Sequence, residues 1–144
     1  MEQSNLAAGP EGVSLQRLPL VDDPRGCLSF AEVGRHIPFA VKRYFLVYRV
    51  PAEQVRGGHA HREQHQFLVC VHGHCSVLAD DRVNRQEFAL DSPQTGLYLP
   101  PMIWSAQYNY SSDAVLLVLT SGEYDPAEYI KDYAEFTRIR RAGL

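Results

Sequence analysis

Short stretches of alternating or consecutive apolar residues recur along the chain, and most are separated by proline, glycine or aspartate. The segment 41–50 is rich in β-branched and aromatic side chains and stops at Pro51, which predicts a strand. Similar patterns predict a strand through His59 and His61 and further strands at 13–20, 67–71, 75–79, 84–90, 97–99, 104–110 and 114–120, with a short strand or turn at 27–32. Many short strands with little helix predict an all-β fold, best matched by a jelly-roll β-sandwich or small barrel.

The end of the chain carries a helical pattern. Asp125, Pro126 and Glu128 have the spacing of an N-cap, a first-turn proline and a capping-box glutamate. Apolar side chains then follow at helical spacing at positions 129, 130, 133 and 136. These features predict one short C-terminal helix. Residues 1–12 are small and polar, so we expect a disordered tail there and a single domain over residues 13–144.

The composition of the chain argues against nucleic acid and membranes as partners. The chain has 144 residues, a net charge of -3 and a pI near 6.0, which gives no basic surface for nucleic acid. It contains no apolar run long enough to span a membrane, and its first residues lack the apolar region of a signal peptide. We therefore expect a cytoplasmic protein with no membrane partner. The three cysteines, Cys27, Cys70 and Cys75, are expected to be free thiols.

The segment 56–73 holds most of the candidate chemistry. Gly57 and Gly58 permit backbone conformations that other residues avoid, and they lead into His59-Ala60-His61. Histidines at i and i+2 of a strand project from the same face. Such a pair suits acid–base catalysis or metal binding, and a hydrogen-bonded structural pair is the remaining alternative.

The same segment carries a family resemblance. Gly57-Gly58-His59-Ala60-His61, followed by Gln66 and Gly73, resembles the first cupin motif, and Gly96-Leu97-Tyr98-Leu99-Pro100 resembles the second. The stretches VRGGHAHREQHQFLVCVHGHCSV, LYLPPMIW and SGEYDPAEYIKDY resemble one cupin branch, the sugar 3,4-ketoisomerases that act on dTDP-4-keto-6-deoxyglucose. The likeness covers about residues 18–136. It implies a cupin-type jelly roll and a homodimer, with N-terminal strands exchanged between the subunits as one arrangement.

The residues present argue against a cupin metal centre. Such a centre commonly uses two histidines, a glutamate and a third histidine. The chain supplies His59 and His61, but Gln66 stands where the motif has glutamate and Ser105 where it has the third histidine. His65 or Glu63 could complete a site only from outside the motif. We expect no metal and no other cofactor, which is also what the ketoisomerase branch implies.

Histidine chemistry is sufficient for the implied reaction. Moving a ketone from C4 to C3 of a hexose requires removal of the C3 proton and delivery of a proton to C4, through an enediol or enediolate. A base with a pKa near neutral is suited to the first step, and hydrogen-bond donors or positive charge stabilise the oxyanion. His59 and His61 are the predicted catalytic residues, without a division of roles. The product would be a dTDP-3-keto-6-deoxyhexose for deoxysugar and aminosugar biosynthesis.

Other residues are predicted to bind the substrate. The resemblance places Arg25 near the sugar, where it would influence the C4 configuration of the product. It makes Arg49 a substrate or oxyanion contact, and an exposed arginine in a salt bridge is the alternative. Arg56 could bind a phosphate through its guanidinium. The remaining predicted contacts are Gln66, Ser105 and the aromatic residues Tyr48, Trp104 and Tyr108, for which core packing is the alternative.

Two departures from the branch leave other functions open. Ser105-Ala106 stands where His or Arg and a polar residue are expected, and Phe45 stands where many relatives have tyrosine. The alternatives are a related dTDP-4-keto-sugar epimerase, a non-catalytic nucleotide-sugar-binding cupin and a metal-dependent dioxygenase. Product NMR, solvent exchange into the sugar and a metal assay would separate them.

Overall fold

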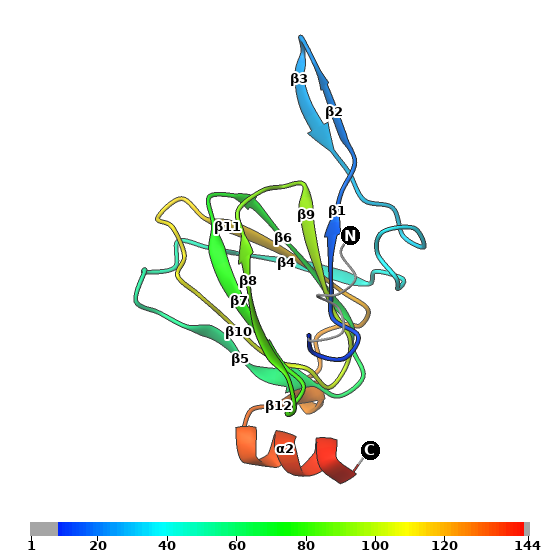
Figure 1. Ribbon diagram of the computed structural model, residues 1–144, viewed down its shortest axis with the longest axis vertical. Helices are drawn as coiled ribbons and strands as arrows, with labels where there is room; N and C mark the ends of the chain where they lie inside the picture. The colour runs from blue at the N-terminus through cyan, green and yellow to red at the C-terminus, as the bar shows by residue number, and fades with distance from the viewer. Residues whose placement is uncertain (1–8, 143–144) are drawn as a thin grey trace.

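The computed structural model describes residues 9–142, and two antiparallel five-stranded sheets face each other in it (Figure 1). One sheet has the order β1 (Ser14–Arg17), β9 (Thr95–Leu99), β6 (Gln66–His72), β11 (Val115–Thr120) and β4 (Arg43–Tyr48). The other has the order β12 (Tyr129–Ile130), β5 (Arg56–His61), β10 (Trp104–Tyr108), β7 (Cys75–Asp80) and β8 (Arg85–Leu90). The predicted all-β, cupin-type jelly roll is confirmed as an open sandwich, because the two sheets do not close into a barrel.

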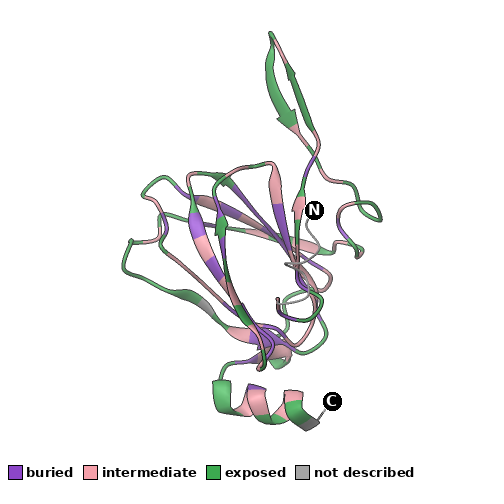
Figure 2. Cartoon of the chain, in the orientation of Figure 1, coloured by how far each residue is buried: buried purple, intermediate pink, exposed green. Residues whose placement is uncertain are grey.

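Side chains from both inner faces form the core between the sheets. Alternate residues along the strands point inward, so buried and less buried positions alternate in β7 and β11 (Figure 2). The most deeply buried members of this core include Leu68, Cys70, Val77, Leu90, Leu97 and Leu116. Cys27, Cys70 and Cys75 are free, as predicted. This core holds the two sheets together and supports the strand that carries His59 and His61.

A separate hairpin, β2 (Leu20–Asp23) and β3 (Gly26–Ser29), projects away from the sandwich (Figure 1). Its strands pair only with each other among the described residues. The tip is the predicted turn, with Gly26 at φ 123°, a backbone conformation that favours glycine. Arg25 lies at this tip and pairs with Asp23 at 2.8 Å.

The predicted C-terminal helix exists, but its start was wrongly predicted. Asp125 caps only a 3₁₀ turn, η1 (Pro126–Glu128), and the α-helix α2 spans Tyr133–Ala142. Between them, Tyr129 and Ile130 form β12 and pair with His61 and Ala60 of β5. The capping signal is local and fits either helix type, whereas pairing with a distant strand determined the actual structure.

Helix α2 packs against the outside of the second sheet. Phe136 is fully buried beside Trp104, and the Tyr133 hydroxyl donates to Asp80 at 2.8 Å. Arg85 also binds Asp80, at 2.9 Å. No helix among the described residues is long and apolar enough to cross a bilayer.

The predicted disordered tail falls mostly on residues 1–8, which lie outside the described residues. Residues 9–12 form a turn in which Val13 donates its N–H to Pro10. The backbone N–H of Glu11 donates to the Asp81 carboxylate at 2.8 Å. The Glu11 carboxylate accepts from Arg140 at 2.8 Å. Pro10 and Glu11 therefore contact the domain that the sequence predicts to begin at Val13.

Candidate active site

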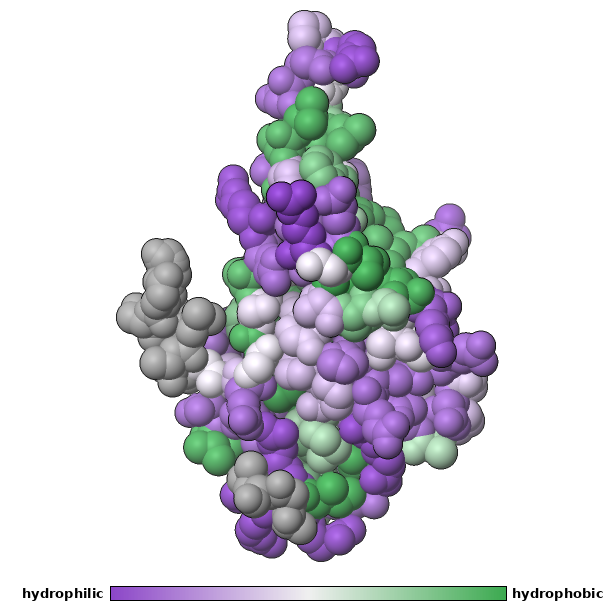
Figure 3. Space-filling view, turned by 90° about the vertical axis from the view of Figure 1, so that its right-hand side faces the viewer, coloured by the Kyte–Doolittle hydropathy of each residue, from purple (hydrophilic) through white to green (hydrophobic). Residues whose placement is uncertain are grey.

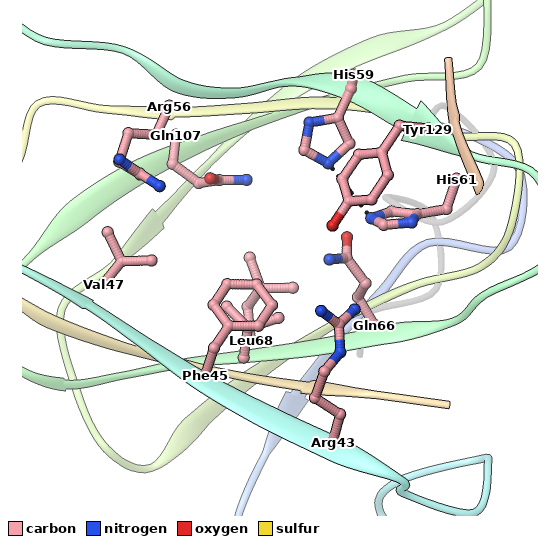
Figure 4. Close-up of a pocket in the computed structure, with 11 residues that line it drawn as sticks. Arg43, Phe45, Val47, Arg56, His59, His61, Gln66, Leu68, Gln107 and Tyr129 are labelled. Carbon is pink, nitrogen blue, oxygen red and sulfur yellow. Dashed lines mark hydrogen bonds between the residues drawn. The ribbon is translucent and has the colours of Figure 1, made fainter. Parts of the chain in front are cut away.

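A cavity of about 280 Å³ opens between the two sheets at one end of the sandwich (Figure 4). Both sheets contribute to its walls. Its lining consists of Arg43, Phe45 and Val47 of β4, Arg56, His59 and His61 of β5, Gln66 and Leu68 of β6, Gln107 of β10, Val118 of β11 and Tyr129 of β12. One part of the wall is therefore apolar, while imidazole, guanidinium, amide and phenol groups line the rest.

His59 and His61 lie side by side on one wall of the cavity (Figure 4). They are two residues apart on β5, so their side chains share a face, and their Nε2 atoms lie 3.3 Å apart. The ring of Tyr129 lies 4.7 Å from the ring of each histidine, measured between centroids. The imidazoles are thus held edge to face with each other and covered by a phenol.

A bulge in β5 brings Arg56 to the same cavity. Against β10, His59 pairs with Ser105 but Arg56 pairs with Gln107, so three steps on β5 oppose two on β10. Residues three apart in a regular strand face opposite sides, and the extra residue corrects this. Gly57 and Gly58 lie in the bulge, which explains the role of the paired glycines in the sequence.

Burial keeps both histidines neutral at pH 7. It lowers the pKa of His59 to about 4, and the nearby His61 and Lys131 charges act in the same direction. Burial also lowers the pKa of His61 to about 4, with a further contribution from the Arg43 guanidinium. A hydrogen bond between two uncharged imidazoles needs a proton on one Nε2 and a lone pair on the other, so the tautomers set its direction.

These lowered pKa values predict acid destabilisation. Unfolded histidine has a pKa of 6.5, so between pH 6.5 and about 4 the unfolded chain binds more protons than the folded one. The free energy of unfolding should fall as the pH is lowered through this window, by on the order of 1–3 kcal/mol per histidine. Urea unfolding at several pH values measures the slope. The double variant H59N/H61N should show a shallower slope, and an equal slope would contradict the assignment.

Arg43 is fixed before any ligand binds. Its Nε donates to Thr120 Oγ1 and to the Gly122 carbonyl, both at 3.2 Å, and its Nη2 donates to Gln64 Oε1 at 3.3 Å. Figure 4 shows the guanidinium beside the Gln66 amide, on the side of the cavity that holds His61. The site therefore carries a preorganised positive charge.

The structure brings four of the predicted site residues to the cavity wall: His59, His61, Arg56 and Gln66. Ser105 lies directly beside them, because it pairs with His59 and its buried hydroxyl accepts from Gln107 at 3.2 Å.

The other predicted contacts lie elsewhere in this chain. Arg25 is at the exposed hairpin tip, and Arg49 is exposed in the turn after β4. Tyr48 is 55% exposed on the outer face of β4. Trp104 packs under α2, and Tyr108 donates its hydroxyl to Glu87. Burial and Glu87 raise the pKa of Tyr108 to about 12.

Sequence reasoning missed Arg43, Gln107 and Tyr129. Strand parity groups Arg43 with residues 45 and 47 on one face and residues 44, 46 and 48 on the other, which identifies Arg43 once the inward face is known. Gln107 follows from Ser105 by the same rule. Tyr129 carried no such signal, because its segment has the pattern of a helix.

The donor set does not fit a cupin metal. Across residues 9–142, no three His, Cys, Asp or Glu side chains come close enough together to hold an ion. His65, one of the residues that could have completed a site, is held by the Tyr98 hydroxyl at 2.6 Å and stacks on Phe39. Glu63 is exposed. The lining of the cavity therefore adds no carboxylate and no third imidazole to His59 and His61.

Comparison with known proteins places this site in a family. The model of the family described as FdtA, WxcM-like, C-terminal, matches residues 11–141. The chain belongs to this family. A curated relative, the TDP-4-oxo-6-deoxy-α-D-glucose-3,4-oxoisomerase of Aneurinibacillus thermoaerophilus, is 42% identical over 116 residues, which cover 81% of this chain and 84% of the relative.

Solved structures agree in fold over almost the whole chain. A 3,4-ketoisomerase from Helicobacter canadensis superposes with a TM-score of 0.87 at 35% identity, covering 90% of this chain and 98% of that one. A mutant of the 3,4-ketoisomerase QdtA from Thermoanaerobacterium thermosaccharolyticum, in complex with TDP-4-keto-6-deoxyglucose, superposes with a TM-score of 0.88 at 29% identity, covering 92% and 96%.

Proposed function

We propose that this chain is a sugar-nucleotide 3,4-ketoisomerase that moves the keto group of dTDP-4-keto-6-deoxyglucose from C4 to C3. One observation carries the assignment: two neutral histidines, 3.3 Å apart, share a small cavity with a fixed guanidinium. The activity named for the 42% identical relative supports this choice of reaction and substrate.

The size of the cavity suits the hexose rather than the whole nucleotide sugar. Its volume of about 280 Å³ is just below the usual range of ligand pockets, about 300–1,000 Å³. The keto sugar would enter the cavity, and the diphosphate would stay at its mouth. Arg56 is exposed there and offers the planar fork of donors that phosphate oxygens accept.

The reaction needs two proton transfers, and the cavity supplies groups for both. A neutral imidazole of the pair takes the C3 proton, and the electron pair moves into the C3–C4 bond as the C4 carbonyl becomes an enediolate. Arg43 stabilises the negative oxygen, because its charge is already oriented. A proton is then added at C4, and the C3 hydroxyl transfers its proton to the oxygen on C4 as the C3 carbonyl forms. Phe45 has no hydroxyl, but Tyr129 places a phenol beside both histidines.

Proton NMR in D₂O with chelator tests this reaction directly. The purified protein should convert dTDP-4-keto-6-deoxyglucose to a 3-keto isomer that carries deuterium at C4, and the C4 coupling pattern gives its stereochemistry. An epimerase would instead exchange a proton next to the carbonyl and leave the ketone at C4. Binding without product or exchange would leave a nucleotide-sugar-binding protein, and product only after metal addition would contradict metal-free catalysis.

We also propose that the protein is a homodimer in which each hairpin packs on the partner. Leu20, Val21, Leu28 and Phe30 expose 40–57% of their surface on the hairpin and its base. Figure 3 shows hydrophobic surface along the hairpin below its polar tip and on the adjoining body of the molecule. Isolated hairpins are marginally stable, and large exposed apolar patches mark interfaces. A partner would cover this surface and receive Arg25 at the tip.

Charge on the hairpin should break the dimer. Sedimentation of the wild-type chain should give twice the monomer mass of 16.3 kDa, and V21E/L28E should sediment as a monomer, because buried unpaired carboxylates are costly. Val83→Glu is the matched control, since Val83 is 70% exposed in the β7–β8 turn. A monomeric wild-type chain would contradict the proposal.

A further inference from the structure

His61 has a buried nitrogen without a hydrogen-bond partner. Its side chain is only 5% exposed, and Nδ1 is one of the few buried side-chain polar atoms in the described part of the chain that make no hydrogen bond. Its other nitrogen, Nε2, contacts His59. A buried N–H without an acceptor is destabilising, so the group that lies behind Nδ1 decides whether this nitrogen carries the proton.

The group behind Nδ1 is the carboxylate of Glu128. Its Oε1 lies 3.9 Å from His61 Nδ1, and the Glu128 side chain is 13% exposed. The same oxygen accepts the backbone N–H groups of Glu63 at 3.0 Å and Gln64 at 2.9 Å. The backbone carbonyl of Glu128 accepts the backbone N–H of Arg62 at 2.9 Å. The next residue, Tyr129, pairs with His61 on β5. The carboxylate is therefore held in place by contacts that do not involve the imidazole.

This arrangement distinguishes the two neutral tautomers of His61. With the proton on Nδ1, an N–H dipole faces a carboxylate, and a shift of about 1 Å would close a charge-assisted hydrogen bond. With the proton on Nε2, the Nδ1 lone pair would face the carboxylate oxygen, and the two would repel. Hydrogen bonds at catalytic groups are often long before ligand binds, so a separation of 3.9 Å fits an orienting carboxylate in the free protein.

We propose that Glu128 is a positioning residue that holds His61 in the Nδ1–H tautomer and so sets the direction of the hydrogen bond between the two histidines. His61 Nε2 then has the lone pair, and His59 Nε2–H donates to it across 3.3 Å. His61 becomes the basic member of the pair and His59 the donor. The tautomer itself is a property of the free protein. Its effect on turnover rests on the proposed ketoisomerase function.

Nitrogen NMR reads this tautomer without substrate. Two-bond ¹H–¹⁵N correlation of histidine-labelled protein at pH 7 distinguishes protonated from unprotonated ring nitrogens, and His59→Asn and His61→Asn assign the signals. The wild-type protein and Glu128→Gln, which keeps an acceptor oxygen, should both show His61 protonated at Nδ1. Glu128→Leu should shift His61 toward the Nε2–H form. Glu63→Gln removes the adjacent exposed carboxylate and should change nothing.

The kcat of Glu128 variants is a second test of the role of this residue. If Glu128 only supported the fold, Glu128→Leu would lower thermal stability and leave kcat per folded molecule unchanged. As a positioning residue, its loss should lower kcat by about 10–100-fold with little change in KM, the usual effect of removing a group that orients a site residue. Glu128→Gln should restore most of the rate.

The outcomes separate the two proposals. A wild-type His61 protonated at Nε2, or an unchanged tautomer in folded Glu128→Leu, would overturn the role of Glu128. If Glu128→Leu does not fold, the wild-type and Glu128→Gln spectra still decide the tautomer. An inactive wild-type protein with His61 in the Nδ1–H form would support the role of Glu128 and reject the ketoisomerase.

Discussion

Asparagine in place of His59 or His61 should lower the ketoisomerase kcat by about 10²–10⁴-fold, the range that a positioned acid or base contributes. Asparagine keeps a polar side chain in the strand but cannot accept and release a proton near neutral pH. Because the two imidazoles share one proton contact, the double variant should lose little more than the worse single variant. Initial rates of 3-keto product formation by NMR measure the effect.

His72→Asn is the matched control for these variants. His72 ends β6, is exposed, and its ring contacts Asp113 rather than the cavity. This substitution should leave kcat within a factor of two. Deuterium at C3 of unreacted substrate would report proton removal separately from product formation. Either cavity variant with more than half of the wild-type rate would contradict histidine acid–base catalysis.

Methionine in place of Arg43 should lower kcat by about 10²–10³-fold, as for other oriented groups that stabilise an oxyanion. Methionine fills similar space without charge. Arg43→Lys should recover only part of the rate, because an ammonium cannot reproduce the donation to Thr120, Gly122 and Gln64 that orients the guanidinium. Initial rates at saturating substrate measure both variants.

The pH profile supplies an independent reading for Arg43. Its positive charge helps to lower the pKa of His61, so Arg43→Met should raise that pKa above about 4 and move the acid limb of kcat to higher pH. Arg138→Met, in the exposed part of α2, is the control with the same loss of charge. If Arg43→Met kept a rate within threefold of wild type, oxyanion stabilisation would be assigned to another group, with Arg56 the next candidate.

The strands and the histidine pair could be predicted because their signals are local. Alternation with period two and the proline and glycine breaks place most strands within a few residues, and His59 and His61 share a face by the same rule. Parity would also have placed Tyr48 outside the cavity and Arg43 inside it. That reading required knowing which face of β4 points inward, and a mixed aromatic strand does not show it.

The remaining site residues depend on long-range pairing. The Asp125 cap fits a 3₁₀ turn as well as an α-helix, and only the pairing of Tyr129 with His61 determines that a strand follows. That pairing delivers both Tyr129 and Glu128 to the histidines. The position of Arg25 shows a different limit. The strands of its hairpin pair with no other strand among residues 9–142, and under the dimer proposal the tip acts in another molecule.

The two faces of β4 have separate surroundings. Arg43, Phe45 and Val47 line the cavity, while Tyr44, Leu46 and Tyr48 are 45–66% exposed on the opposite face. Substitutions at odd-numbered positions of this strand therefore change the cavity, while substitutions at even-numbered positions change only the exposed face of the sheet. A new sugar preference could evolve on one face of β4 without altering the outer surface, and that surface could change without altering the cavity.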